Sequence, residues 1–139
     1  MVSLICGEKG KGKTKTLLEK VNEVSQSADG NVIYIDKDSK KMYELNNKIR
    51  LINMTDYPIS NNDEFVGFLC GIISQDHDIE EIFLDSFLTI SHVKDEYLEH
   101  TINKLSEIST QYQVNFEVSI SKKSEDLPQS LQDIITVAL

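Results

Sequence analysis

Short apolar runs recur along the chain, separated by glycine or by clusters of polar residues. The runs are rich in Val, Ile, Leu and Phe and are shorter than a typical helix, which is the pattern of buried strands. The first run, VSLIC, stops directly before Gly7. We predict strands at residues 2–6, 31–36, 49–53, 81–87, 115–121 and 133–139, with 49–53 at an edge.

Between these runs, apolar residues recur every three or four positions, which is the spacing of an amphipathic helix. The polar stretch at 53–63 contains Pro58 and predicts a loop, with Asp63 capping the helix that follows it. We predict helices over 13–27, after Asp63 and over 94–112, and short helical segments at 39–46 and near Leu127-Pro128.

Strands and helices therefore alternate through all 139 residues. This alternation favours a mainly parallel sheet covered by helices on both faces. The expected fold class is α/β, a three-layer αβα arrangement with five to six strands. The length fits one domain.

Composition narrows the class of partner. The net charge of −9 and the pI near 4.7 disfavour broad binding to nucleic acid, because the surface repels polyanions. No apolar stretch is long enough to span a membrane, and no signal peptide is visible. Cys6 and Cys70 form no disulfide framework or metal motif. We therefore expect a cytoplasmic protein.

One segment departs from this acidic character. Residues 7–14 read GEKGKGKT and match the pattern G-x-x-x-x-G-K-[ST] at every fixed position. A chance match on a basic surface turn is the alternative, but a predicted strand precedes the segment and a predicted helix follows it. We predict a phosphate-binding loop that uses Gly7, Glu8, Lys9, Gly10, Lys11, Gly12, Lys13, Thr14 and Lys15.

Each fixed position of this motif has a physical role. Glycines let backbone N–H groups approach phosphate oxygens with no Cβ in the way. Lys13 is expected to reach the β- and γ-phosphates of ATP, and the hydroxyl of Thr14 to contact Mg²⁺. The positive end of the helix that begins near Lys13 adds to the same anion site.

A second Mg²⁺ partner is usually an acidic residue at the end of an apolar strand. Asp85 ends the run IFLD and is predicted to support the metal through a bound water. Hydrolysis also requires a carboxylate that orients water. Asp36 and Asp38 follow the second strand and would point the same way if that strand continued. The alternative is that Asp36 and Asp38 are ordinary solvated charges in a loop.

Positive charge is expected to offset the charge that develops during phosphoryl transfer. The chain has a single arginine, Arg50, on the predicted edge strand. Lys122 and Lys123 follow the strand at 115–121. We consider all three as candidate cationic fingers, acting within the chain or across a subunit interface, with ordinary surface lysines as the alternative.

The order of these motifs resembles the RecA and KaiC group of P-loop ATPases over nearly the whole chain. Residues 5–18 resemble their Walker A strand, loop and helix, and IFLDSFLT at 82–89 resembles their Walker B strand. In VIYIDKD, Asp38 lies where that group has its catalytic glutamate. The segment LSEISTQYQVNFEVSIS resembles their strand that ends in a polar sensor, a place that Ser121 takes here. DNA-binding loops of the recombinases are absent or very short.

The sequence thus predicts an Mg²⁺-dependent ATP-binding protein, a slow ATPase or an ATP-driven switch. A nucleotide-binding interaction module with little hydrolysis is the alternative, since Ser86 rather than glutamate follows Asp85. A small-molecule kinase is less favoured because arginine is scarce, and a GTPase because N-K-x-D and D-x-x-G segments are missing. We expect an unidentified protein partner or a homo-oligomer.

Overall fold

The sheet of the protein contains six strands in the order β3-β2-β4-β5-β1-β6, and every neighbouring pair is parallel. The structure is a computed structural model that describes residues 1–139. Its strands are β1 (Val2–Cys6), β2 (Asn31–Asp36), β3 (Ile49–Asn53), β4 (Ile79–Leu84), β5 (Asn115–Ile120) and β6 (Ile135–Ala138). The expected edge position of residues 49–53 is confirmed.

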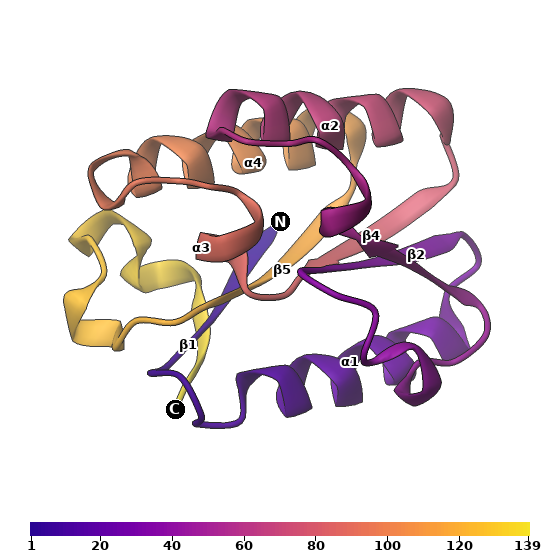
Figure 1. Cartoon of the computed structure of the whole chain (residues 1–139), viewed down its shortest axis with the longest axis horizontal. Helices are drawn as coiled ribbons and strands as arrows, with labels where there is room; N and C mark the ends of the chain where they lie inside the picture. The colour runs from indigo at the N-terminus through magenta and orange to yellow at the C-terminus, as the bar shows by residue number, and fades with distance from the viewer.

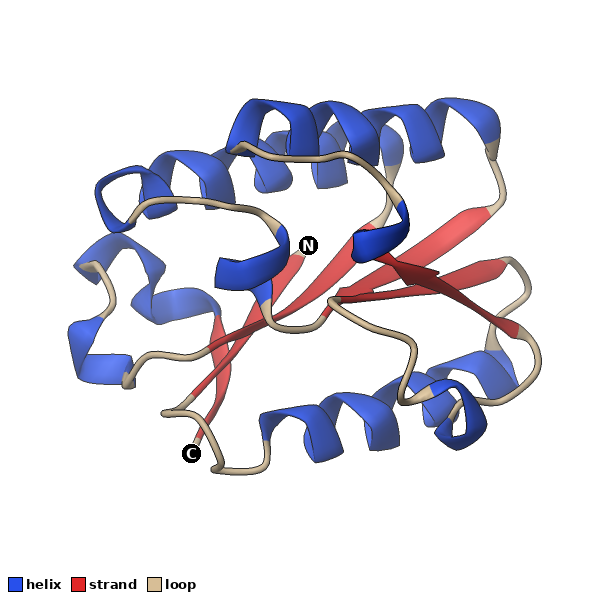
Figure 2. Cartoon of the chain, in the orientation of Figure 1, coloured by secondary structure: helices blue, strands red, loops and turns tan.

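Helices cover both faces of this sheet, which confirms the three-layer α/β fold (Figure 1). Helix α1 (Lys13–Ser27) covers one face together with the short 3-10 helix Met42–Glu44, while the other α-helices lie on the opposite face (Figure 2). These are α2 (Asn62–Gln75), the single turn α3 (Phe87–Ile90) and α4 (Leu98–Tyr112).

Two hydrophobic cores result from this arrangement. The larger contains 24 buried residues, among them Phe65 of α2 and Leu105 of α4. The smaller contains eight residues beneath α1, including Leu17, Tyr34 and Phe83. Each strand of the centre is therefore buried on both faces, which explains why the runs read as nearly continuous apolar stretches.

Several element boundaries differ from those predicted. The strand predicted over 81–87 spans Ile79–Leu84, because Ser86 takes a left-handed conformation (φ 55°) that turns the chain into α3. Asn61, and not Asp63, caps α2 by accepting the N–H of Glu64. Three further predicted segments contain 3-10 helices, at Met42–Glu44 within 39–46, at Asp95–Tyr97 before α4 and at Gln129–Ile134 before β6. Strand β5 ends at Ile120 and not at residue 121.

The position of β5 between β1 and β4 determines where polar side chains meet. Because all strands are parallel, their carboxyl ends lie at one edge of the sheet. The segments that follow β1, β2, β4 and β5 therefore emerge close together, and ligands of open α/β sheets usually bind at such an edge.

Candidate functional site

The loop between β1 and α1 is shaped by its glycines. Gly10 and Gly12 have φ angles of 86° and 101°, which side chains rarely adopt, and a Cβ at either position would meet no atom within 4 Å. Gly12 precedes α1, and no side chain caps that helix. The first N–H groups of α1 have no partner within the helix, so they are available to an anion.

Gly7 has a different reason to be glycine. A Cβ there would lie 3.0 Å from both the Cβ and the carbonyl oxygen of Leu139. The backbone N–H of Leu139 donates to the carbonyl oxygen of Cys6 at 2.8 Å, so β6 continues alongside the start of the loop. Figure 1 shows the two segments side by side. The beginning of the loop is therefore held by the sheet.

A cavity of about 530 Å³ opens beside the loop. It collects residues from the loop and from the segments after β2, β4 and β5, as expected from the parallel sheet. Its lining is polar, with one apolar side chain, and contains a single carboxylate. The lining residues are Lys9, Gly10, Gly12, Lys13, Thr14, Lys37, Asp85, Ser86, Leu88, Thr89, Ser119 and Ser121.

Lys13 is the most enclosed cation of this cavity, with 7% of its surface exposed. Its Nζ donates to the backbone carbonyl oxygen of Glu8 at 3.0 Å. Burial lowers the pKa of Lys13 below its usual value, and the negative charge of Asp85 acts in the opposite direction. A buried cation with one neutral partner favours a negatively charged ligand.

Asp85 follows β4 directly and is 2% exposed. Its Oδ2 accepts a hydrogen bond from the hydroxyl of Tyr34 at 2.7 Å. Its Oδ1 accepts from the hydroxyl of Ser119 at 2.7 Å and from the N–H of Ser86 at 2.9 Å. The carboxylate therefore reaches the cavity from a fixed, hydrogen-bonded position.

The two aspartates at the end of β2, Asp36 and Asp38, lie outside the cavity lining. Strand β2 ends at Asp36, so the continuing strand that would align Asp36 with Asp38 is absent. Asp36 is 3% exposed, and burial together with the charge of Asp85 raises its pKa to about 6. Asp38 is half-buried, and its Oδ1 accepts the N–H of Lys40 at 3.0 Å. Oδ1 of Asp36 likewise accepts the N–H of Lys37 at 2.7 Å, so each carboxylate hydrogen-bonds to the neighbouring backbone.

The three candidate fingers lie apart from the cavity lining. Arg50 contacts Asp76 at 3.8 Å, and Lys122 contacts Asp95 at 3.1 Å. Lys123 lies 3.8 Å from the carboxylate of Glu8. Outside the glycine-rich loop and α1, the cation that lines the cavity is instead Lys37, which our sequence interpretation missed. Its position directly after a predicted strand, between two aspartates, was the available signal.

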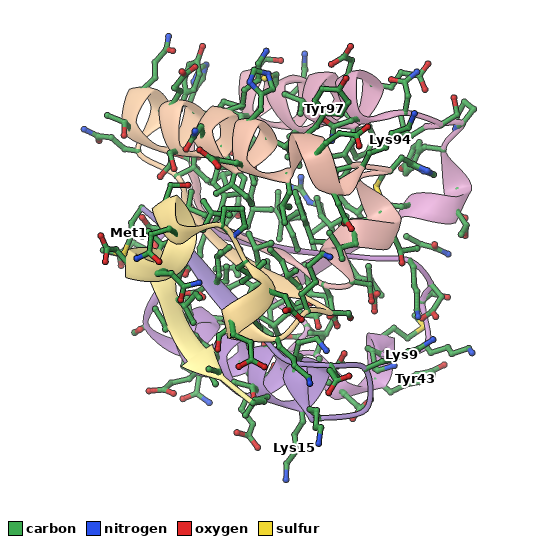
Figure 3. All side chains as sticks on the ribbon, turned by 90° about the vertical axis from the view of Figure 1, so that its left-hand side faces the viewer. Met1, Lys9, Lys15, Tyr43, Lys94 and Tyr97 are labelled. Carbon is green, nitrogen blue, oxygen red and sulfur yellow. The ribbon has the colours of Figure 1, made fainter.

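The remaining predicted loop residues divide into two groups. Lys9 and Ser121 line the cavity, whereas Glu8, Lys11 and Lys15 are exposed outside it. The side chain of Lys15 extends away from the body of the protein (Figure 3). The roles of Tyr34 and Ser119, which donate hydrogen bonds to Asp85, were not predicted from the sequence. The residue pattern of a strand does not show which of its side chains lies near the end of a neighbouring strand.

No protein-family model matches the chain, and no curated protein matches it.

The structure contains no cluster of three or more His, Cys, Asp or Glu side chains suited to a metal ion. None of its helices combines the length and the apolar character that crossing a membrane requires.

Proposed function

We propose that this protein binds Mg·ATP in the cavity beside the glycine-rich loop and acts as an ATP-driven switch or slow ATPase, similar to the RecA and KaiC group. One observation carries the proposal. The loop at residues 7–14 joins a buried strand to an uncapped helix, and Lys13, Thr14 and Asp85 line one cavity beside it. A fold alone assigns no activity, so these side chains are the basis of the functional assignment.

The site fits a triphosphate. Gly10 and Gly12 leave open space where a Cβ would stand, so backbone N–H groups can approach phosphate oxygens. Helix α1 contributes the positive end of its dipole, and Lys13 and Lys9 contribute positive charge. The protein as a whole is acidic, so this concentration of lysine favours one small anion rather than a polyanion.

The site also fits Mg²⁺. Thr14 and Asp85 supply a hydroxyl and a carboxylate to the same cavity, and oxygen atoms are the ligands that Mg²⁺ prefers. In nucleotide sites this ion takes few protein ligands and is completed by water and phosphate oxygens, so no larger acidic cluster is required. When bound, the metal neutralises negative charge on the phosphates.

Slow hydrolysis or none is the form of this function that the geometry favours. Asp36 and Asp38 do not line the cavity, and Asp85 is its single carboxylate. The alternative, a nucleotide-binding interaction module without significant turnover, is supported by this same observation. In either form, another molecule has to recognise the ATP-bound conformation. We therefore propose an unidentified protein partner or a second copy of the chain.

Other assignments have less support. Arg50 is the single arginine and lies against Asp76, away from the cavity lining, which disfavours a kinase that closes an arginine-rich lid.

We also propose a cytoplasmic location, since Cys6 and Cys70 are both free thiols. Nucleic acid is an unfavourable partner for a protein of this charge.

ATP binding to the purified protein, titrated with and without Mg²⁺, tests the proposal. Lys13→Ala removes a charge-assisted contact and should weaken binding by about 10- to 100-fold. Lys104→Ala, an exposed lysine of α4, is the control and should bind like the parent. A parent protein that binds no ATP would contradict the proposal.

A further inference from the structure

Two hydroxyl groups from different strands hold the carboxylate of Asp85. Tyr34 of β2 donates to Oδ2, and Ser119 of β5 donates to Oδ1, both at 2.7 Å. Because β2 and β5 are the two neighbours of β4, the donors approach the carboxylate from both sides. The carboxylate cannot rotate without losing one of these bonds.

The Tyr34 hydroxyl is itself firmly placed. Tyr34 is fully buried, and its ring stacks against Phe83 with 6.3 Å between the ring centres. Its hydroxyl makes one hydrogen bond, to Asp85. A tyrosine hydroxyl is protonated at neutral pH, and at 2.7 Å from a carboxylate oxygen it is a hydrogen-bond donor. Tyr34 does not line the cavity, so its effect on a ligand passes through Asp85.

We propose that Tyr34 and Ser119 are positioning residues that orient the carboxylate of Asp85 and thereby set the affinity of the nucleotide site for Mg²⁺. This inference rests on the proposed function. Donors to a ligating carboxylate restrict its orientation, and their removal typically lowers metal affinity by about 10- to 100-fold. Tyr34 does not line the cavity, so nucleotide contacts that do not involve the metal are independent of its hydroxyl.

The test separates metal affinity from nucleotide affinity. ATP binding is measured at equilibrium across a series of Mg²⁺ concentrations, and separately in excess chelator. Tyr34→Phe keeps the ring and removes the hydroxyl. We expect it to raise the Mg²⁺ concentration for the half-maximal effect by about 10- to 100-fold and to leave binding in chelator unchanged. Tyr43→Phe, at a tyrosine that is 93% exposed, is the matched control and should change neither value.

Ser119→Ala provides a second, independent variant, and a shift in the same direction is expected. Circular dichroism and a urea melt establish that each variant is folded. A folded Tyr34→Phe or Ser119→Ala protein with the parent's Mg²⁺ response would overturn the inference while leaving the proposed function intact. An equal loss of ATP binding with and without Mg²⁺ would also overturn it, because a general structural defect has that signature. A parent that binds no ATP would overturn both proposals.

Discussion

The side-chain nitrogen of Lys13 donates a hydrogen bond to the backbone carbonyl oxygen of Glu8, five residues earlier in the same loop. The ammonium group has three N–H donors and uses one of them here, so two remain for a ligand. A charged phosphate oxygen is a stronger acceptor than a carbonyl oxygen. We therefore expect Lys13 to donate to an anion in the cavity while the contact to Glu8 holds its side chain in place.

Lys37 should matter for turnover more than for binding. It is the only cation of the cavity lining that lies outside the loop and its helix, at the end of β2. If it faces charge that develops during phosphoryl transfer, Lys37→Ala should lower the rate of ATP turnover by about 100-fold. Steady-state phosphate release measures this rate.

The control for Lys37 is Lys40→Ala, an exposed lysine of the same connection. ATP affinity of Lys37→Ala should stay within a few-fold of the parent. Equal turnover in the parent and in Lys37→Ala would contradict this role.

The two aspartates at the end of β2, Asp36 and Asp38, can be distinguished by the same assay. Asp38 is half-buried and accessible to water, whereas Asp36 is buried with a raised pKa. We expect Asp38→Asn to retain ATP binding and the turn to Lys40, since an amide oxygen also accepts an N–H, but to lower turnover by about 100-fold. Asp36→Asn should lower turnover less. If Asp36→Asn lowered turnover more than Asp38→Asn, Asp36 would be the residue that orients the attacking water.

Glycine substitutions separate close packing from backbone preference. A Cβ at Gly30 would lie 2.1 Å from the backbone carbonyl oxygen of Asp78, so Gly30→Ala should lower the free energy of unfolding by about 1–3 kcal/mol. Gly71 is exposed in α2, and a Cβ there meets nothing within 4 Å. Gly71→Ala should raise the same quantity by about 0.5–1 kcal/mol. Urea denaturation measures both, and similar effects of the two changes would refute this distinction.

The half-buried Glu81 and the buried Glu117 predict a pH dependence of stability. Burial, and then the charge of Glu117, raises the pKa of Glu81 to about 7, while Lys20 of α1 partly opposes this. The charges of Glu80 and of the amino terminus at Met1 act weakly in opposite directions. One oxygen of Glu117, Oε2, is buried without a hydrogen-bond partner. The folded state therefore favours a proton on the carboxylate of Glu81.

The sign follows from linkage. The folded protein holds the Glu81 proton more tightly than the unfolded chain, so the stabilisation is complete below the ordinary pKa of 4.5 and is lost as the pH rises to about 7. Glu81→Gln should remove on the order of 2 kcal/mol of this decline, allowing for partial exposure. Urea unfolding at pH 5 and pH 8 measures it, with Glu107→Gln on the exposed face of α4 as the control. A decline as steep in Glu81→Gln as in the parent would exclude Glu81 as its origin.

The fold was largely predictable because its signals are local. Apolar runs and helical periodicity identified the alternation of strands and helices, and parallel pairing followed from it. The exception is instructive. The run IFLDSF reads as one strand, yet Ser86 reverses the backbone and Phe87 packs edge-on against Phe65 of α2, with 6.1 Å between the ring centres. Periodicity cannot show that turn, because both segments are buried and apolar.

The site was predictable only where its residues are neighbours in the chain. Gly12, Lys13 and Thr14 belong to one contiguous motif, so spacing alone brought them together. Tyr34 and Lys37 reach the site because β2 pairs with β4, and strand order is not encoded in any local pattern. Lys122 was a reasonable candidate by its place after β5, but a nearby acidic residue holds its side chain.

The position of β1 between β5 and β6 has a consequence for how the protein forms. Val2 pairs with Phe116 and Cys6 with Ile120, and the other side of β1 pairs with β6. Loop closure over so much chain is entropically costly, and such non-local pairing slows folding. During synthesis, residues 7–14 therefore leave the ribosome long before the strands that anchor them exist. The cavity is among the last features to form, and a nascent chain that ends before β5 carries its basic motif without a site.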